Sequence, residues 1–160
     1  MKAGPVTEAI RDLRPGDLEA AYRLDQTCFE EGIAYTRGQI RDFLTRDGAI
    51  ALAADAPDGS LVAFAIGHVA GSRGHVVTID IATPHRRQGL GQRLLSELKA
   101  RMAAGGAREV RLEVDKRNLT AIRFYERMGF RATRTLPDYY GAGLDGLRMT
   151  RRLEARQARQ

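Results

Sequence analysis

A loop with two glycines, set between a strand-like segment and a helical segment, most constrains what this 160-residue chain can fold into. The run 85–95 reads His-Arg-Arg-Gln-Gly-Leu-Gly-Gln-Arg-Leu-Leu and follows the apolar segment 76–82 and Pro84. Beyond the loop, apolar residues recur at the spacing of one helix face, at Leu90, Leu94, Leu95, Leu98 and Met102. A strand, a glycine loop and a helix in this order predict an α/β unit.

The same loop has the chemistry of an anion site. The first N–H groups of a helix have no partner within the helix, and its N-terminus carries positive potential. Gly89 and Gly91 permit close backbone approach because neither has a Cβ, and Arg86, Arg87 and Arg93 add positive charge. We therefore expect a pyrophosphate-binding loop, with an ordinary basic helix start as the alternative. The Rossmann motif has a third glycine, and a P-loop ends in Gly-Lys-Ser/Thr, so neither fits.

Composition narrows the class of protein. The length predicts one domain, residues 1–153, followed by a short tail, 154–160. No apolar run is long enough to span a membrane, and the N-terminus has no apolar signal region. A single cysteine, Cys28, excludes an internal disulfide and favours a cytoplasmic location, with the thiol buried. The three histidines form no metal-ligand pattern, so we expect no metal.

The charge is unevenly distributed along the chain. Residues 1–72 hold 7 Lys and Arg against 11 Asp and Glu, whereas residues 73–160 hold 19 against 9. A polyanionic ligand at the glycine loop explains the basic half. Nucleic acid is the competing explanation, but the chain has no Trp and its basic half lacks the interleaved aromatic residues of RNA-binding modules.

The expected elements follow the order β-α-α-β-β-β-α-β-α-β-β, which predicts a mixed α/β sheet with helices on both faces. Strands are expected at 6–10, 50–54, 61–66, 76–82, 110–114, 130–136 and 147–153. Helices are expected after Asp17 as N-cap, after Thr36 with Gln39 in a capping box, at 90–102 before Gly105 and Gly106, and at 119–128 before Gly129. Strands 50–54 and 61–66 are apolar at successive positions, so we expect both of their faces to be buried.

Glu113 lies in the middle of an expected central strand. Alternation places Val110, Leu112 and Val114 on one face, so that Arg111 and Glu113 share the other. A carboxylate here is uncommon unless it is paired or works in catalysis. The residue types leave both interpretations open: an ion pair with Arg111 or another arginine, or an acid–base role.

The helix after this strand carries a second group of candidates. Asn118 suits an N-cap, and its amide could also reach a ligand along the helix start. Ala121 and Tyr125 lie one turn apart on one face, and the small Ala121 leaves room beside it. A helical aromatic is more often part of the core than of a catalytic site, so the local pattern alone favours packing for Tyr125.

Two blocks of sequence resemble the GNAT family of N-acetyltransferases. The Arg-x-x-Gly-x-Gly spacing at 86–91 is similar to its acetyl-CoA signature, and Leu112-Glu113-Val114, Asn118, Ala121-Ile122, Tyr125 and Gly129-Phe130 are similar to its second block. With Tyr139-Tyr140, Asp145-Gly146 and Met149, the likeness is nearest to the bacterial ribosomal-protein alanine N-acetyltransferases and their archaeal and eukaryotic relatives. It covers 79–149. The resemblance implies a six- to seven-stranded, mostly antiparallel central sheet flanked by about four helices.

The resemblance also implies roles for residues. Acetyl-CoA would be the cosubstrate, without a metal. Its pantetheine arm and pyrophosphate would be held by Ile81, Ala82, Thr83, Arg86, Arg87, Gln88, Gly89, Leu90, Gly91, Gln92, Arg93, Asn118, Ala121 and Tyr125. Glu113 and Tyr125 would be catalytic, and Glu113, Tyr139 and Tyr140 would line the acceptor-amine site.

The implied chemistry is direct attack of an amine on the thioester, which needs no nucleophilic Cys or Ser. Glu113, through water and with a pKa raised by burial, would accept the proton. A backbone N–H of segment 81–83 would polarise the carbonyl. Tyr125 would hydrogen-bond the leaving thiolate or, with a lowered pKa, protonate it, because phenol is ordinarily the weaker acid.

A protein N-terminal α-amine is the expected acceptor, since its pKa of about 8 makes it easier to deprotonate than a lysine. A lysine or small-molecule amine is the alternative, followed by a non-catalytic CoA-binding or RNA-binding module. The chain departs from the ribosomal-protein enzymes at Gly32–Tyr35, at Thr83 and at Ala142–Leu144, where acceptor specificity is normally set. We expect a monomer or homodimer that does not bind a membrane.

Overall fold

The computed structural model describes residues 9–154, which form seven strands, four α-helices and two short 3-10 helices. The elements are β1 Ile10–Asp12, η1 Pro15–Asp17, α1 Leu18–Cys28, α2 Arg37–Thr45, β2 Ala49–Asp55, β3 Leu61–Ala70, β4 Arg73–Ile81, η2 Thr83–His85, α3 Leu90–Ala104, β5 Glu109–Asp115, α4 Leu119–Arg127, β6 Arg131–Leu136 and β7 Gly146–Arg152. The predicted order of strands and helices is confirmed.

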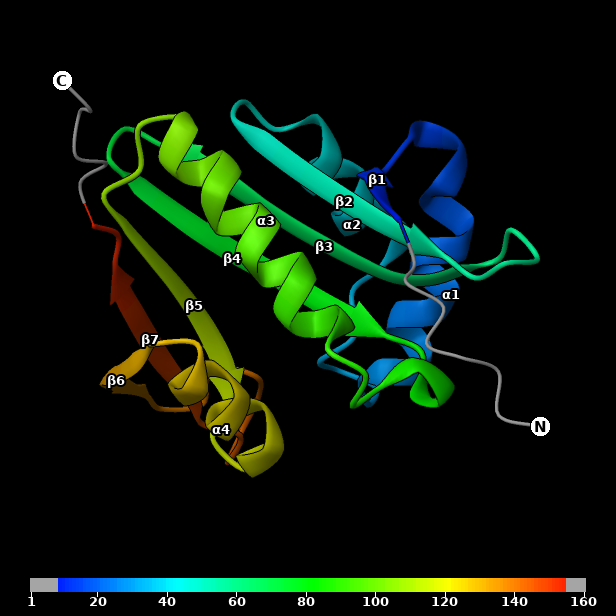
Figure 1. Ribbon diagram of the computed structural model, residues 1–160. Coiled ribbons are helices and arrows are strands. Elements are labelled where there is room, and N and C mark those ends of the chain that lie inside the picture. The colour runs from blue at the N-terminus through cyan, green and yellow to red at the C-terminus, as the bar shows by residue number, and fades with distance from the viewer. Residues whose placement is uncertain (1–8, 155–160) are drawn as a thin grey trace, which may run out of the picture.

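The seven strands make one sheet in the order β1-β2-β3-β4-β5-β7-β6. Among the described residues only β4 and β5 pair in parallel, because α3 carries the chain back across the sheet between them (Figure 1). The other neighbouring strands run antiparallel. The mixed, mostly antiparallel sheet expected from the sequence is therefore confirmed.

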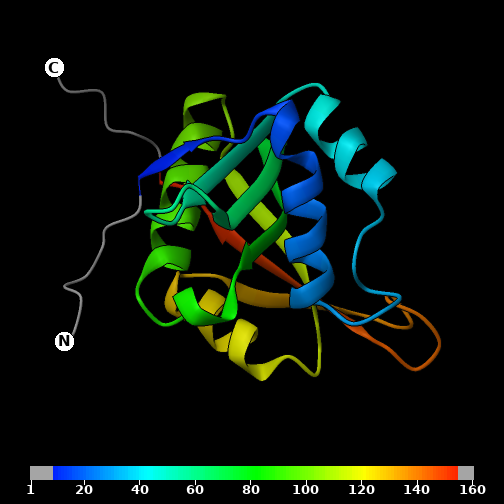
Figure 2. The ribbon, with the colours of Figure 1, turned by 90° about the vertical axis from the view of Figure 1, so that its right-hand side faces the viewer.

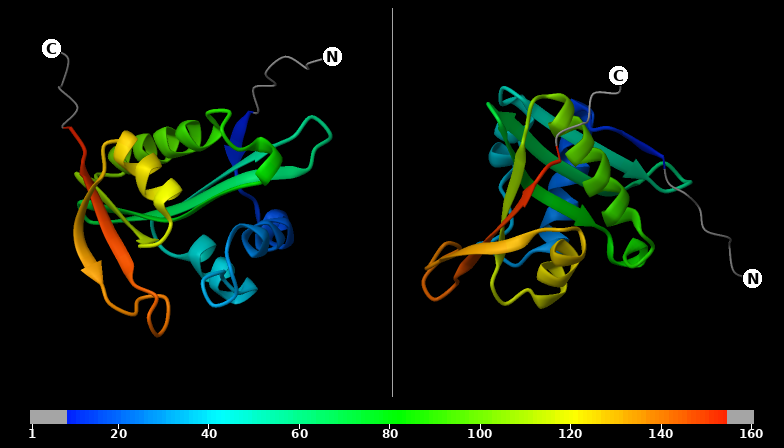
Figure 3. Two further views of the ribbon diagram at one scale, coloured as in Figure 1. Left: turned by 90° about the horizontal axis from the view of Figure 1, so that it is seen from below. Right: turned by 60° about the vertical axis from the view of Figure 1, so that its left-hand side comes forward.

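Helices cover both faces of the sheet. Viewed edge-on, α3 and α4 lie over one face, and α1 and α2 over the other (Figure 3, left). The connection 137–145 between β6 and β7 extends on the same side as the segment 29–36 between α1 and α2 (Figures 2 and 3). No helix among residues 9–154 has both the length and the apolar character needed to cross a membrane.

The main core lies between α3 and the sheet. The five apolar residues predicted to share one face of α3 are all buried, at Leu90, Leu94, Leu95, Leu98 and Met102. Strands β2 and β3 are buried on both faces, as predicted, because α3 covers one and α1 with α2 the other. A second, smaller cluster under α1 and α2 includes Ala21, Ile40 and Phe64.

Several boundaries differ from the predicted ones. Within the expected strand 6–10, residues 6–8 lie outside the described residues, and β1 begins at Ile10. Strand β4 starts at Arg73, three residues earlier than expected, because it pairs with both β3 and β5 there. Of the expected tail 154–160, all but Glu154 lies outside the described residues.

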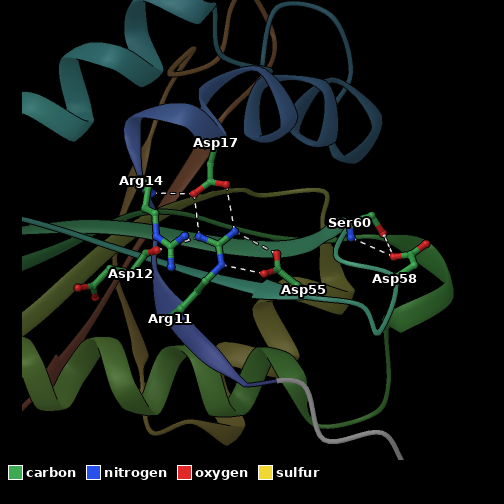
Figure 4. Close-up of polar contacts among 7 residues, drawn as sticks. All are labelled: Arg11, Asp12, Arg14, Asp17, Asp55, Asp58 and Ser60. Carbon is green, nitrogen blue, oxygen red and sulfur yellow. Dashed lines mark hydrogen bonds and ion pairs between the residues drawn. The ribbon is translucent and has the colours of Figure 1, made fainter.

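Two of the three predicted helix N-caps, at the starts of α1 and α2, have different outcomes. Thr36 and Gln39 form the expected capping box, with Gln39 N–H 3.1 Å from Thr36 Oγ1 and Thr36 N–H 2.9 Å from Gln39 Oε1. Asp17 occupies the N-cap position of α1 but makes no side-chain cap hydrogen bond, so that prediction was wrong. Its carboxylate accepts instead from the Arg11 guanidinium and from Arg14 N–H (Figure 4).

Arg11 joins the start of α1 to the sheet. Its guanidinium contacts Asp17 at 2.8 Å and Asp55 at 2.8 Å. The side-chain hydrogen bond from Arg11 lowers the pKa of Asp17, with a further contribution from the Arg14 N–H. These contacts therefore stabilise the fold above the ordinary Asp pKa and are lost as the pH falls.

Arg11→Gln is expected to lower the free energy of unfolding by about 1 kcal/mol at neutral pH, since partial exposure screens the pair. This loss of unfolding free energy should shrink at acid pH as Asp17 becomes protonated. Chemical denaturation of the wild type and the variant at neutral and at acid pH measures it. Arg23→Gln is the control, because Arg23 contacts Glu19 on the surface of α1 and should contribute little. Equal effects of the two variants would contradict the prediction.

Candidate functional site

The sheet opens between β4 and β5. The two strands pair only from Arg73 with Glu109 to Val76 with Leu112, although β4 continues to Ile81 and β5 to Asp115. A β-bulge opposite Gly67 adds a residue to β4 just where the pairing ends. The carboxyl ends of the two strands therefore separate, which is where open α/β sheets bind ligands. We call this opening the β4–β5 gap.

The glycine loop lies next to the end of β4. Gly89 has a left-handed backbone, with φ of 82°, and a Cβ there would meet no atom within 4 Å. The first backbone hydrogen bond of α3 runs from Arg93 N–H to the Gly89 carbonyl, so the N–H groups between them precede the first helical bond. An open, left-handed glycine before the N-terminus of a 15-residue helix fits the expected phosphate cradle.

Gly91 has a different reason to be glycine from the one expected. A Cβ on Gly91 would lie 3.0 Å from Ile81 Cδ1 and 3.5 Å from a Phe124 ring atom. The residue is buried and lets the start of α3 approach β4 and α4 closely. Close packing therefore explains why residue 91 is glycine. Of the two glycines, only Gly89 borders open space that a ligand could enter.

Several other predicted cofactor residues lie between the end of β4 and the glycine loop. Ala82 N–H donates to the Val62 carbonyl at 2.8 Å, and Thr83 begins the short helix η2. Arg86 turns toward β4: its Nε donates to the Ile81 carbonyl at 2.9 Å, and its Nη2 lies 3.5 Å from Cys28 Sγ. The Cys28 thiol is half-buried rather than fully buried as expected, and burial raises its pKa.

Glu113 is held by groups from three other segments. Its Oε1 lies 2.6 Å from His75 Nε2 on β4 and 3.4 Å from the Tyr139 hydroxyl, and its Oε2 lies 3.3 Å from Arg148 Nε on β7. The side chain is 8 % exposed. Residues Val110, Leu112 and Val114 are buried on the opposite face, as the alternation predicts.

The expected direction of the Glu113 pKa was wrong. Burial alone would raise it, but hydrogen bonding and charge from His75 and then Arg148 outweigh burial and lower the pKa below its ordinary value. The arginine partner is Arg148 rather than the neighbouring Arg111. Glu113 is therefore a carboxylate at neutral pH.

Sequence reasoning missed His75, which was considered only as a metal ligand. A signal was nevertheless present, because a crossover helix between two strands predicts that they pair in parallel. The register places His75 opposite Arg111, two residues from Glu113. The exposed fraction of its side chain is 27 %, so His75 connects the buried carboxylate to solvent.

Tyr125 packs on the opposite side of the sheet from Glu113. Its ring meets those of Phe124 and Phe130 edge-on, with centroids 5.2 Å and 5.8 Å away. Burial raises its pKa, with a smaller contribution from Asp80, so the proposed lowered pKa was wrong and the phenol stays protonated. Asn118 accepts from Ala121 N–H at 3.1 Å, which confirms its cap role at the start of α4.

Three tyrosine side chains lie near Glu113. Tyr139 and Tyr140 stand edge-to-face in the β6–β7 connection, with ring centroids 4.9 Å apart, and Tyr139 is 50 % exposed. Tyr35, between α1 and α2, donates its hydroxyl to the Val77 carbonyl at 3.4 Å. Burial raises the pKa of Tyr35 and of Tyr140. Tyr139 raises both pKa values further, and Tyr35 also raises that of Tyr140.

Comparison with known proteins agrees with this geometry. The chain is 28% identical over 144 residues to an uncharacterised N-acetyltransferase of Methanocaldococcus jannaschii, covering 89% of this chain and 90% of that protein. An N-alpha-acetyltransferase of Sulfurisphaera tokodaii is 40% identical over 78 residues, 48% of this chain, and the match spans 47% of that protein. The chain thus spans about half the length of that relative.

A solved structure shares the whole fold. Ard1 from Thermoplasma volcanium superposes with a TM-score of 0.84 and 29% sequence identity, covering 94% of this chain and all of that one. Residues 18–130 match the family described as the acetyltransferase (GNAT) family. This match covers more than half of the chain, from α1 through the glycine loop to the end of α4. The chain therefore belongs to the acetyltransferase (GNAT) family.

Proposed function

We propose that this protein transfers an acetyl group from acetyl-CoA to a primary amine, and that the preferred acceptor is a protein N-terminal α-amine. The observation that carries the proposal is the ionised Glu113, which lies at the β4–β5 gap with His75 leading to solvent. The archaeal relative named as an N-alpha-acetyltransferase supports the choice of acceptor.

The glycine loop would hold the cosubstrate. Exposed Arg87, Gln88 and Gly89 and the N-terminus of α3 would bind its pyrophosphate. Segment 81–83 and Asn118 would hold the pantetheine arm along the gap. Acetyl-CoA supplies the thioester that the amine attacks, and backbone groups and side chains of this protein would bind and orient it.

Glu113 and Tyr125 would act from opposite faces of the sheet. The lowered pKa of Glu113 suits it to orient an amine that is already partly neutral, since an α-amine has a pKa of about 8. The amine's proton would pass to the Glu113 carboxylate, which His75 and Arg148 hold in place, and then to solvent. Tyr125, protonated because its pKa is raised, would donate a hydrogen bond to the leaving thiolate.

Tyr125→Phe is expected to lower kcat by about 10²-fold, the effect of removing one donor from a developing anion. The KM for acetyl-CoA should change little, because the ring still packs on Phe124 and Phe130. Steady-state assays of released thiol measure both. Tyr22→Phe is the control, since Tyr22 lies under Arg37, away from the gap. A kcat unchanged in Tyr125→Phe would remove this role.

An acceptor screen tests the proposal. Peptides with free α-amines, peptides with blocked α-amines and an internal lysine, and polyamines would be compared by released thiol and by mass. The highest kcat/KM is expected with free α-amines. Turnover restricted to lysine or polyamines would refute the α-amine as the preferred acceptor. The absence of turnover with every amine would refute the proposed activity.

A further inference from the structure

Two carboxyl groups lie buried together beneath the proposed acceptor site. Asp25 on α1 and Asp80 on β4 are 0 % and 1 % exposed, and with Thr78 they are the buried polar residues of the described chain. A buried carboxyl is uncommon without a cation. No described Lys, Arg or His forms an ion pair with either of them.

Each carboxyl has one oxygen with a donor and one without. Asp25 Oδ2 accepts from Tyr35 N–H at 2.7 Å, and Asp80 Oδ1 accepts from Thr78 Oγ1 at 2.5 Å. Asp25 Oδ1 and Asp80 Oδ2 have no hydrogen-bond donor among the described residues. The two carboxyls meet where α1 packs on β4: Cys28, one helical turn after Asp25, contacts the carbonyl of Ile81, the residue after Asp80. Asp25 accordingly acts directly on the pKa of Asp80.

Two ionised carboxylates are both acceptors and cannot bond to each other. A single proton between the two unpaired oxygens supplies the missing donor and satisfies both buried atoms at once. It also leaves one negative charge in place of two in a site without a cation. Of the two, Asp80 is the one that carries the proton, because burial and the contact with Asp25 raise its pKa.

We propose that Asp25 and Asp80 share one proton, and that this pair positions Tyr35 on the acceptor side of the site. The proposal rests on the proposed function for its catalytic consequence. Asp25 accepts a hydrogen bond from the backbone N–H of Tyr35, and the shared proton would bond Asp25 to Asp80 on β4. The Tyr35 hydroxyl in turn reaches Val77 on β4, beyond the last residue that pairs with β5. Tyr35 is thus fixed at both ends beside the β4–β5 gap.

The surroundings set the direction of the pH effect. The titratable or charged groups near the pair are Cys28 on α1, Tyr35, Arg86 after β4 and Tyr125 on α4. Burial raises the pKa of Asp80 well above its ordinary value, followed by the contact with Asp25; Thr78 and Arg86 act against this rise but do not cancel it. The folded protein therefore binds more protons than the unfolded chain, and stability falls as the pH rises from the ordinary to the raised pKa.

Asp80→Asn keeps the hydrogen bond to Asp25 but removes its dependence on a titrating proton. The asparagine amide can donate to Asp25 at any pH, and its oxygen can still accept from Thr78. Urea denaturation from about pH 5 to about pH 9 should show the folding equilibrium constant of the wild type falling relative to Asp80→Asn, by up to about tenfold per pH unit. Asp42→Asn, an exposed carboxyl on α2, should run parallel to the wild type. If Asp80→Asn also runs parallel, the shared proton is refuted.

Kinetics test the positioning role. The ratio of the acceptor KM of the wild type to that of Asp80→Asn cancels the titration of the amine itself. This ratio should rise with pH while the ratio of kcat values stays constant, because the pair acts on Tyr35 and not on the reacting atoms. A pH-independent ratio would overturn the positioning role. If no amine is acetylated, the denaturation series still decides whether the proton is shared, so failure of the function and of the pair are distinguishable.

Discussion

Glu113→Gln is expected to lower kcat for amine acetylation by about 10²- to 10⁴-fold, the range for loss of a positioned acid–base group. The amide oxygen can still accept a hydrogen bond, but the side chain can no longer take up the proton of the amine. Binding of acetyl-CoA should persist, because Glu113 lies on the face of β5 opposite the core that α3 covers and the glycine loop is untouched. Single-turnover kinetics and coenzyme A titration measure the two effects separately.

The lowered pKa of Glu113 determines how the activity should change with pH. Because its pKa is lowered, Glu113 stays ionised through the neutral range, and its contribution is lost only as the pH falls through that depressed value. The main rise in activity should therefore follow the acceptor amine, with its pKa of about 8. Glu109→Gln is the matched control, since Glu109 lies on the same strand but pairs with Arg73 at the surface. A rate lost equally in both variants would indicate damage to β5 instead of chemistry.

Gly89→Val is expected to abolish most of the thermal stabilisation that acetyl-CoA gives. At a hundredfold excess over Kd, a ligand adds about 2.7 kcal/mol, which raises the Tm of a domain of this size by about 5 to 10 °C. A β-branched residue is strained at the φ of 82° and projects into the open side of the loop. Thermal denaturation with and without acetyl-CoA measures the shift.

Gly59→Val provides a close control for that experiment. Gly59 lies in the β2–β3 turn with φ of 87°, and a Cβ there also meets no atom within 4 Å. Backbone strain is therefore similar in the two variants, whereas only Gly89 lies at the N-terminus of α3. Both should lose some intrinsic stability, but Gly59→Val should keep the full ligand shift. A full shift in Gly89→Val would remove the phosphate cradle from the loop.

Local signals made much of the fold predictable. The apolar face of α3 and the Thr36–Gln39 capping box depend on residues within one or a few turns, so sequence alone placed them correctly. Asp17 shows where local signals fail. The guanidinium of Arg11 on β1 binds both Asp55 on β2 and the Asp17 carboxylate, which therefore does not cap α1. A cap is a weak interaction, and a guanidinium outcompetes it.

The site was predictable in its residue types but not in its electrostatics. Glu113 stands out in the sequence, yet its pKa is set by His75 and Arg148, which are 38 and 35 residues away. Burial of Tyr125 likewise depends on how α4 packs. The pair of Asp25 and Asp80 gave no signal, because 55 residues separate two aspartates that meet only when α1 lies on β4.

One peptide that carries both a free α-amine and an internal lysine tests the central claim most directly. After incubation with acetyl-CoA and the wild-type protein, fragmentation by mass spectrometry locates the acetyl group. We predict acetylation of the α-amine, loss of the reaction in Glu113→Gln, and its retention in Glu109→Gln. Acetylation of the lysine alone, or no acetylation of either amine, would contradict the claim.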